Sequence, residues 1–235
     1  MSTGSRSLDI IVPVFNEEDS IDPFMARLER LGYADALLFV DNASTDGTVE
    51  RIRRQGARLV RHTRNEGYGS SIRDGIAATS GELIVVIDAD LEYPPEAIPA
   101  IVDALATHPV VYASRFLGTK PPDMPAVRRL GNQAATALYD LLFSQRTTDL
   151  QTGMKGLRRG ALPLSALRRP GFEHTVELGA MITLAGHRIY DVPVEYQPRQ
   201  HGRSKMRHVP EVGKLLSLLV GYWMRCVVLG RPLPA

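Results

Sequence analysis

The sequence predicts an α/β fold in which a mostly parallel central sheet is flanked by helices. Three observations predict it: near-continuous apolar runs typical of strands buried on both faces, segments with helical spacing of apolar side chains, and the alternation of the two along the first half. With 235 residues, 44% of them hydrophobic, the chain is long enough for one large core. In such sheets, ligands collect at the carboxyl ends of the strands.

The first half supplies the elements in alternating order. The run LDIIVPV (8–14) is the first expected strand, and apolar side chains at Ile21, Phe24, Leu28 and Leu31 indicate a helix over 18–31. The same reasoning gives strands over 36–40, 58–61, 83–87 and 110–113, and helices over 48–55, 70–78 and 98–106. Beyond Lys120 the pattern changes: a proline-rich loop leads into an amphipathic helix over 126–143, then a mixed α and β portion that ends in a helix around 210–229.

Charge distribution and cysteine content indicate the cellular compartment and the class of partner. Residues 1–118 carry 11 Lys/Arg against 18 Asp/Glu, giving −7, whereas residues 119–235 carry 17 against 8, giving +9. This asymmetry indicates two tasks on one fold, with drift of surface charge as the alternative. The lone Cys226 cannot form an internal disulfide, and no signal-peptide pattern is present, so we expect a cytoplasmic protein. No basic stripe with interleaved aromatic residues is present, so nucleic acid is not an expected partner.

Carboxylates follow three of the expected strands, in the segments PVFNEE (13–18), DNASTDGT (41–48) and DADLE (88–92). Parallel strands bring their carboxyl ends to one edge of the sheet, so we expect these loops to converge. Clustered acids require a compensating cation or ligand. An Asp-x-Asp segment suits Mg²⁺, which one or two carboxylates hold together with phosphate oxygens of a ligand. Helix capping by Ser44 or Asp46 and a solvated acidic turn are the alternatives.

Several other site classes are excluded by missing motifs. The sequence has no P-loop, no Gly-x-Gly-x-x-Gly after the first strand, no nucleophile-elbow serine and no clustered His/Cys zinc spacing. His62, His108 and His208 are expected to be ordinary surface residues, and Cys226 a packing residue.

Motifs in order along the chain resemble those of family-2 glycosyltransferases of the GT-A fold, a Rossmann-like α/β architecture. The first are PVFNEE (13–18), VDNASTDGT (40–48), NEGYG (65–69) and DADLEYPPE (88–96). The later segments DLQTGMKGLRR (149–159), 172–196 and RQHGRSKM (199–206) are similar to the dolichyl- and polyprenyl-phosphate mannosyltransferases and their glucosyl relatives. The resemblance covers residues 8 to 206. We therefore divide the chain into a GT-A domain (1–206) and an amphipathic C-terminal helix (207–235) that packs on the domain, a partner subunit or a membrane surface.

The resemblance implies a nucleotide-sugar donor, Mg²⁺ or Mn²⁺, and an inverting transfer. It assigns donor binding to Pro13, Phe15, Glu17, Asp41, Asp88, Ala89, Arg115 and Arg199. It assigns the metal to Asp88, Asp90 and Glu92, and contact with phosphate to Arg199 and Lys205. The candidate catalytic residues are Arg128, Asp149 and Lys205. A phosphate acceptor is already ionised at pH 7 and needs no general base, whereas a hydroxyl acceptor needs one, for which the candidates are Asp149, Glu173 and Glu177.

Three departures from the branch pattern concern the donor. Glu92-Tyr93 stands where the branch has Gln-His, Asn42-Ala43 where it has Asp-Gly, and Met154-Lys155 where it has Phe-Arg. These changes leave the sugar and the base open. The first hypothesis is transfer from GDP-mannose to a polyprenyl phosphate. The second is transfer from a UDP-sugar to a soluble hydroxyl acceptor, and the third is a catalytically silent nucleotide-binding module.

The first hypothesis requires contact with a membrane, and the residues that could provide it lie in the C-terminal half of the chain. Basic residues precede the ten-residue apolar stretch 215–224, which is too short to span a bilayer. Beside Tyr222 and Trp223 they predict peripheral contact with the cytoplasmic membrane face. Packing of the same helix on the domain's own core or across a homo-oligomer is the alternative.

Overall fold

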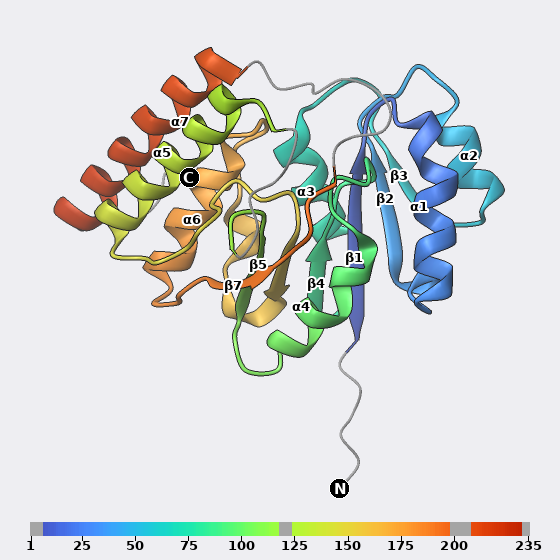
Figure 1. Cartoon of the computed structure of the whole chain (residues 1–235), viewed down its shortest axis with the longest axis horizontal. Helices are drawn as coiled ribbons and strands as arrows, with labels where there is room; N and C mark the ends of the chain where they lie inside the picture. Colours follow the sequence, from blue (N-terminus) through green and yellow to red (C-terminus); the bar gives the residue numbers. More distant parts are fainter. Residues whose placement is uncertain (1–6, 118–123, 198–207, 232–235) are drawn as a thin grey trace, which may run out of the picture.

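A seven-stranded sheet forms the centre of the protein in a computed structural model that describes residues 7–117, 124–197 and 208–231 (Figure 1). Its strands are β1 (Leu8–Val14), β2 (Leu37–Asp41), β3 (Arg58–Arg61), β4 (Leu83–Val86), β5 (Val110–Ser114), β6 (Lys155–Arg158) and β7 (Tyr190–Pro193). The helices are α1 (Glu18–Arg30), α2 (Thr48–Arg54), α3 (Tyr68–Ala77), α4 (Ile98–Ala104), α5 (Ala126–Phe143), α6 (His174–Leu184) and α7 (His208–Trp223), with a π-helical turn at Met224–Val228. The strands and helices predicted for the first half are confirmed within a few residues at their ends.

The strand order is β3-β2-β1-β4-β6-β5-β7. β1 pairs in parallel with β2 and β4, β2 with β3, and β5 with β7, whereas β6 runs antiparallel between β4 and β5. The expected parallel sheet is therefore confirmed for the first four strands. β5 does not continue it beside β4, because β6 is inserted between them.

Two apolar layers cover the two faces of the sheet, because successive side chains of a strand point to opposite faces. On β1, Ile10 and Val12 pack with Phe24 and Leu28 of α1 and with Ile101 of α4. The intervening Ile11 packs on the other face, where the buried side chains come from α3, α5, α6 and α7. Figure 1 shows α5 and α7 side by side at one end of the molecule and α2 at the other.

The C-terminal helix α7 uses one face for packing on the rest of the chain. Leu215, Leu219, Tyr222 and Cys226 are buried at helical spacing against the layer that contains α5 and α6. In the described parts of the chain, every helix is too short or too polar to span a bilayer.

The three acidic loops meet at one edge of the sheet, as expected. The register pairs Val14 at the end of β1 with Asp41 at the end of β2, and Ile11 with Val86 at the end of β4. Each loop contains one non-glycine residue with a positive φ: Asn16 at 53°, Ala43 at 64° and Leu91 at 62°. Left-handed backbone at non-glycine residues is costly and is concentrated at functional sites, so this sheet edge is the place to look for the site.

Candidate active site

A cavity of about 440 Å³ opens at this sheet edge. Nine of the predicted site residues line it: Pro13, Phe15, Glu17, Asp88, Ala89, Asp90, Glu92, Arg115 and Arg128. These residues come from the end of β1, the loops after β1, β4 and β5, and the first turn of α5. The loops after β1 and β4 therefore meet at the cavity, whereas only Asn42 lines it from the loop after β2.

Asp88 and Asp90 form the acidic part of the cavity. Asp88 Oδ1 accepts a hydrogen bond of 2.7 Å from the Tyr68 hydroxyl, and Asp90 Oδ1 accepts one of 3.0 Å from the Glu92 amide. Burial, followed by the charge of Asp90, raises the pKa of Asp88 to about 7, while the Tyr68 hydrogen bond opposes the rise. A divalent cation bound here would offset the repulsion between the Asp88 and Asp90 carboxylates, so the pair is suited to hold one.

Arg115 and Asp149 form a buried, bidentate ion pair behind the acidic residues. Arg115 Nε lies 2.7 Å from Asp149 Oδ2, and Arg115 Nη2 lies 2.8 Å from Asp149 Oδ1. The Arg115 backbone amide donates to the same carboxylate, and Nη2 also donates to the Gln151 carbonyl. Burial opposes the charge of Arg115, but Asp149 outweighs it and raises the arginine's pKa further. The guanidinium is thus fixed as a cation at the cavity wall, and Asp149 lies behind it.

Glu92 and Arg128 connect the loop after β4 with the start of α5. Arg128 Nη2 lies 3.3 Å from Glu92 Oε2, and Arg128 Nη1 donates to the Tyr196 hydroxyl at 3.5 Å. The side chain of Glu92 is 8% exposed and that of Arg128 is 19% exposed. Arg128 therefore compensates the negative charge that Glu92 has and a glutamine at this position would lack.

The backbone of Gly153 packs so closely against Asp88 that it leaves no room for a side chain. A Cβ atom at this position would lie 2.3 Å from Asp88 Oδ2 and 2.9 Å from a ring carbon of Tyr93. The Gly153 amide donates to the Tyr93 hydroxyl at 2.9 Å. Tyr93 itself is buried, with the Arg115 guanidinium 5.7 Å from its ring centre. Tyr93 therefore supports both Arg115 and the turn that contains Gly153.

Four predicted candidates do not line the cavity. The Asp41 carboxylate is fully buried, accepts from the Ser44 amide at 3.0 Å and pairs with Arg61, so it shapes its own loop. Asp149, Glu173 and Glu177 do not line the cavity; Glu173 pairs with Lys214, and Glu177 accepts from the Arg168 and Arg169 amides. Arg199 and Lys205 fall outside the residues that the structure describes.

The structure adds cavity residues that sequence reasoning did not assign. They include Asn42, Asn65, Tyr68, Asn132, Gln151 and Phe172. The buried amide nitrogen of Gln151 has no hydrogen-bond partner, which leaves a donor for a ligand. Lys155 lies beneath the cavity and is 1% exposed. Burial lowers its pKa to about 8 although Asp88 opposes the shift. Most of these positions lie inside the motifs quoted above, and that membership was the only feature of the sequence that could have pointed to them.

The prediction that His62 is an ordinary surface residue is wrong. Its side chain is 7% exposed and lies against Asp74 and Asn42. The reason is that β3 ends under the first turns of α3, which cover the ring.

Comparison with known proteins identifies the family. Residues 9–163, about two thirds of the chain, match the family described as glycosyl transferase family 2. The chain belongs to this family. The family and the enzyme class predicted from the motifs are thereby confirmed, and so is the GT-A-like fold.

Two curated relatives of this glycosyltransferase transfer sugars to lipid phosphates, according to their names. The dolichol-phosphate mannosyltransferase of Pyrococcus furiosus is 26% identical over 210 residues, which are 85% of this chain and 59% of that protein. The undecaprenyl-phosphate mannosyltransferase of Micrococcus luteus is 27% identical over 208 residues, which are 83% of this chain and 86% of that protein.

A solved structure with the same fold is glucosyl-3-phosphoglycerate synthase from Mycobacterium tuberculosis in complex with Mn²⁺, UDP and phosphoglyceric acid. It has a TM-score of 0.70 and 23% sequence identity, and it covers 97% of this glycosyltransferase and 80% of its own chain. At this identity the similarity establishes the fold alone.

Proposed function

We propose that this glycosyltransferase is an inverting hexosyltransferase that moves a sugar from a nucleotide-sugar, with GDP-mannose as the best candidate, to a polyprenyl phosphate. The observation that carries the proposal is the cavity itself, which is lined both by the carboxylates Asp88 and Asp90 and by the arginines Arg115 and Arg128. A sugar diphosphate requires both: acids for its counter-ion and fixed cations for its negative charge. The names of the two curated relatives support the acceptor class.

The acidic residues fit Mg²⁺ or Mn²⁺. Asp88, Asp90 and Glu92 are neighbouring carboxylates, and the raised pKa of Asp88 reflects burial and their mutual repulsion. We assign the ion to these three residues, with Glu92 sharing its charge between the ion and Arg128. When bound, such an ion neutralises the charge that develops on the leaving diphosphate.

The remaining assignments follow the distribution of side chains around the cavity. We assign the nucleoside to Pro13, Phe15 and Glu17, and the donor phosphates to Ala89 and Arg115, with Arg199 joining them from outside the described residues. Asp41 holds the loop that borders the nucleoside.

At the acceptor end, we assign the phosphate to Arg128 together with Lys205. The acceptor is ionised before it arrives, so the chain needs to orient it and does not need to remove a proton. Asp149 contributes by fixing Arg115, and we propose it as a positioning residue in place of the general base considered from the sequence.

Calorimetry tests the donor, with purified full-length protein and GDP-mannose, UDP-glucose and UDP-GlcNAc, each with Mn²⁺ and with EDTA. Metal-dependent binding of GDP-mannose alone supports the proposal, and mannosylation of undecaprenyl phosphate in detergent then tests the acceptor. Selective binding of a UDP-sugar contradicts the donor assignment.

A second candidate function is transfer from a UDP-sugar to a soluble hydroxyl acceptor. Both arginines that line the described cavity are already paired, Arg115 with Asp149 and Arg128 with Glu92, which leaves less positive charge for an acceptor phosphate. Glucosyl transfer from UDP-glucose to a soluble acceptor, without activity towards polyprenyl phosphate, would establish this candidate.

We also propose peripheral contact with a membrane through α5 and the end of α7. These neighbouring helices expose large apolar side chains at Val127, Leu130, Leu141, Val220, Met224, Val227 and Val228. An apolar helix face beside basic residues suits the interface of an anionic bilayer. A second copy of the chain is the alternative occupant, and sedimentation without lipid distinguishes the two.

A further inference from the structure

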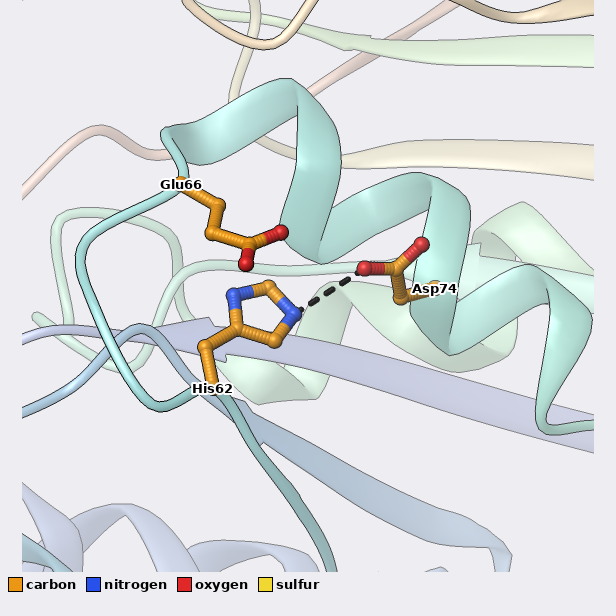
Figure 2. Close-up of side chains that lie close together, drawn as sticks. All are labelled: His62, Glu66 and Asp74. Carbon is orange, nitrogen blue, oxygen red and sulfur yellow. Dashed lines mark ion pairs between the residues drawn. The ribbon is translucent and has the colours of Figure 1, made fainter.

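A group of metal-ligand side chains lies outside the active-site cavity. His62 follows β3, Glu66 precedes α3 and Asp74 lies within α3; Figure 2 shows the three side chains converging. One ligand atom from each residue lies within 4.8 Å of the other two. None of the three lines the cavity that holds Asp88 and Asp90.

Hydrogen bonds determine which nitrogen of His62 carries the proton. The Asn42 side-chain atom beside His62 Nδ1 also accepts a hydrogen bond of 2.7 Å from the Glu66 amide, so that atom is an oxygen. His62 Nδ1, 3.2 Å from this oxygen, must therefore be the donor. In a neutral imidazole the proton on Nδ1 leaves a lone pair on Nε2.

The Nε2 atom of His62 faces a carboxylate without a hydrogen bond to it. It lies 3.1 Å from Asp74 Oδ2, the contact that Figure 2 marks as an ion pair, but it is buried and the geometry makes no hydrogen bond. A neutral ring turns its lone pair toward the carboxylate, and two lone pairs repel each other, so this pair needs a cation, which is either a proton on Nε2 or a metal ion. A metal ion bound to both atoms gives such a separation, because ligand atoms about 2.1 Å from one ion lie roughly 3.0–3.4 Å from each other.

The neighbouring cations do not replace this ion. Arg73 Nε pairs with the other oxygen of Asp74, at 3.0 Å, which leaves Oδ2 toward His62. Arg64 is 85% exposed, and its Nε lies 3.8 Å from Glu66, too far for a hydrogen bond.

We propose that His62 Nε2, Asp74 Oδ2 and the Glu66 carboxylate bind a second divalent ion, of the zinc class. One imidazole and two carboxylates suit Zn²⁺ and its neighbours in the transition series better than Mg²⁺, which prefers oxygen ligands alone. Glu66 and Asp74 are partly exposed, so their side chains can close on the ion.

The ion would fasten the end of β3 to α3, and its effect would extend to the cavity. Asn42 accepts from His62 and Glu66 and donates to Asn65 Oδ1 at 2.9 Å, and Asn65 in turn accepts from the Gly67 amide. Asn42, Asn65 and Gly67 line the active-site cavity. The second ion is thus a structural brace for the wall that borders the donor, and it is independent of the sugar that is transferred.

Cobalt titration tests this site, since Co²⁺ reports bound nitrogen and oxygen ligands by visible absorption. The full-length Asp90→Asn protein, which disables the cavity site, is freed of metal with EDTA and titrated with Co²⁺ without nucleotide. We expect one Co²⁺ per chain and a higher Tm with the ion than without it. Addition of Asp74→Asn should weaken binding at least tenfold, and addition of His62→Gln should do the same.

The matched control is His108→Gln, a half-buried histidine stacked on Tyr190, which should leave Co²⁺ binding unchanged. Should His62→Gln fail to fold, the partly exposed Asp74→Asn still decides the question. The proposal is overturned if the Asp90→Asn protein binds no Co²⁺, which is the result expected if His62 and Asp74 form a simple ion pair. It is also overturned if Asp74→Asn binds Co²⁺ as tightly as its parent.

Discussion

Arg115 binds both carboxylate oxygens of Asp149, through Nε at 2.7 Å and Nη2 at 2.8 Å. The side chain of Arg115 is 3% exposed and that of Asp149 is fully buried. One member lines the cavity and the other does not. The pair therefore separates two tasks: Arg115 meets the ligand, and Asp149 fixes the arginine's orientation. A carboxylate held behind the arginine does not line the cavity, so it is not placed to take a proton from an acceptor there, which favours a reaction whose acceptor is already ionised.

Asp149→Asn should reduce both stability and activity. Asparagine keeps the shape but removes the charge that compensates a buried guanidinium, so we expect the free energy of unfolding to fall by about 3 kcal/mol. Urea denaturation measures that loss. Under conditions where the variant is folded, kcat should fall more than tenfold with the pH profile unchanged, because a positioning residue donates no proton. Loss of the acidic limb of the profile in the variant would instead indicate a general base. Asp103→Asn, at an exposed site on α4, is the control.

Gly153→Ala should abolish metal-dependent turnover. The added methyl group would lie 2.3 Å from Asp88 Oδ2, so either the turn or the carboxylate must move. Mn²⁺ affinity in the presence of donor, measured by calorimetry, should fall at least tenfold. Gly160→Ala, where a Cβ meets nothing within 4 Å, should retain wild-type affinity. Normal Mn²⁺ binding by Gly153→Ala would remove Asp88 from the metal site.

Metal affinity should depend on pH through Asp88. Its pKa is raised from the usual 3.8 of an aspartate to about 7 in the folded protein, so between about pH 4 and pH 7 the folded metal-free protein holds a proton that the unfolded chain has lost. Stability without metal should therefore decrease as pH rises through this window. A metal ion competes with that proton, so Mn²⁺ should bind about tenfold more weakly at pH 6 than at pH 8.

The control for this dependence is Tyr68→Phe. The Tyr68 hydroxyl donates to Asp88 and lowers its pKa, so removing it should move the midpoint of Mn²⁺ binding to higher pH. An unchanged midpoint would show that another group controls the titration. Asp90→Ala should abolish metal-dependent turnover at every pH.

The strands and loops of the first half could be predicted because their signals are local. β1, β2 and β4 are apolar runs, and parallel pairing alone brings their carboxyl ends together. The insertion of β6 could not be predicted in the same way, since its sequence KGLR has one large apolar residue, and its buried Lys155 donates to the Thr152 carbonyl, a contact that no apolar pattern indicates. Likewise, the roles of Asp149 and His62 depend on contacts with residues distant in sequence, Arg115 and Asn42, which no local pattern encodes.

Leu141→Glu should weaken binding to vesicles that contain anionic lipid. Leu141 is 77% exposed on α5, beside α7, so the substitution adds a negative charge to the apolar surface without disturbing the core. Cosedimentation should show binding reduced severalfold. Arg53→Gln makes the same change in net charge at an exposed site on α2, at the opposite end of the molecule, and should bind as the wild type does. Equal loss in both variants would indicate a general charge effect.

Ala43→Gly should stabilise the protein without impairing it. Ala43 has φ 64° in the loop after β2, in the left-handed region that favours glycine. Left-handed backbone costs a residue with a Cβ roughly 1–2 kcal/mol, and the greater flexibility of an unfolded glycine offsets roughly 0.5–1 kcal/mol of the gain. We therefore expect the free energy of unfolding to rise by about 0.5–1 kcal/mol in urea denaturation. Ala78→Gly, after α3 with φ −84°, is the control and should destabilise. A loss of stability in Ala43→Gly would mean that the strained loop is held by contacts of the Ala43 methyl group.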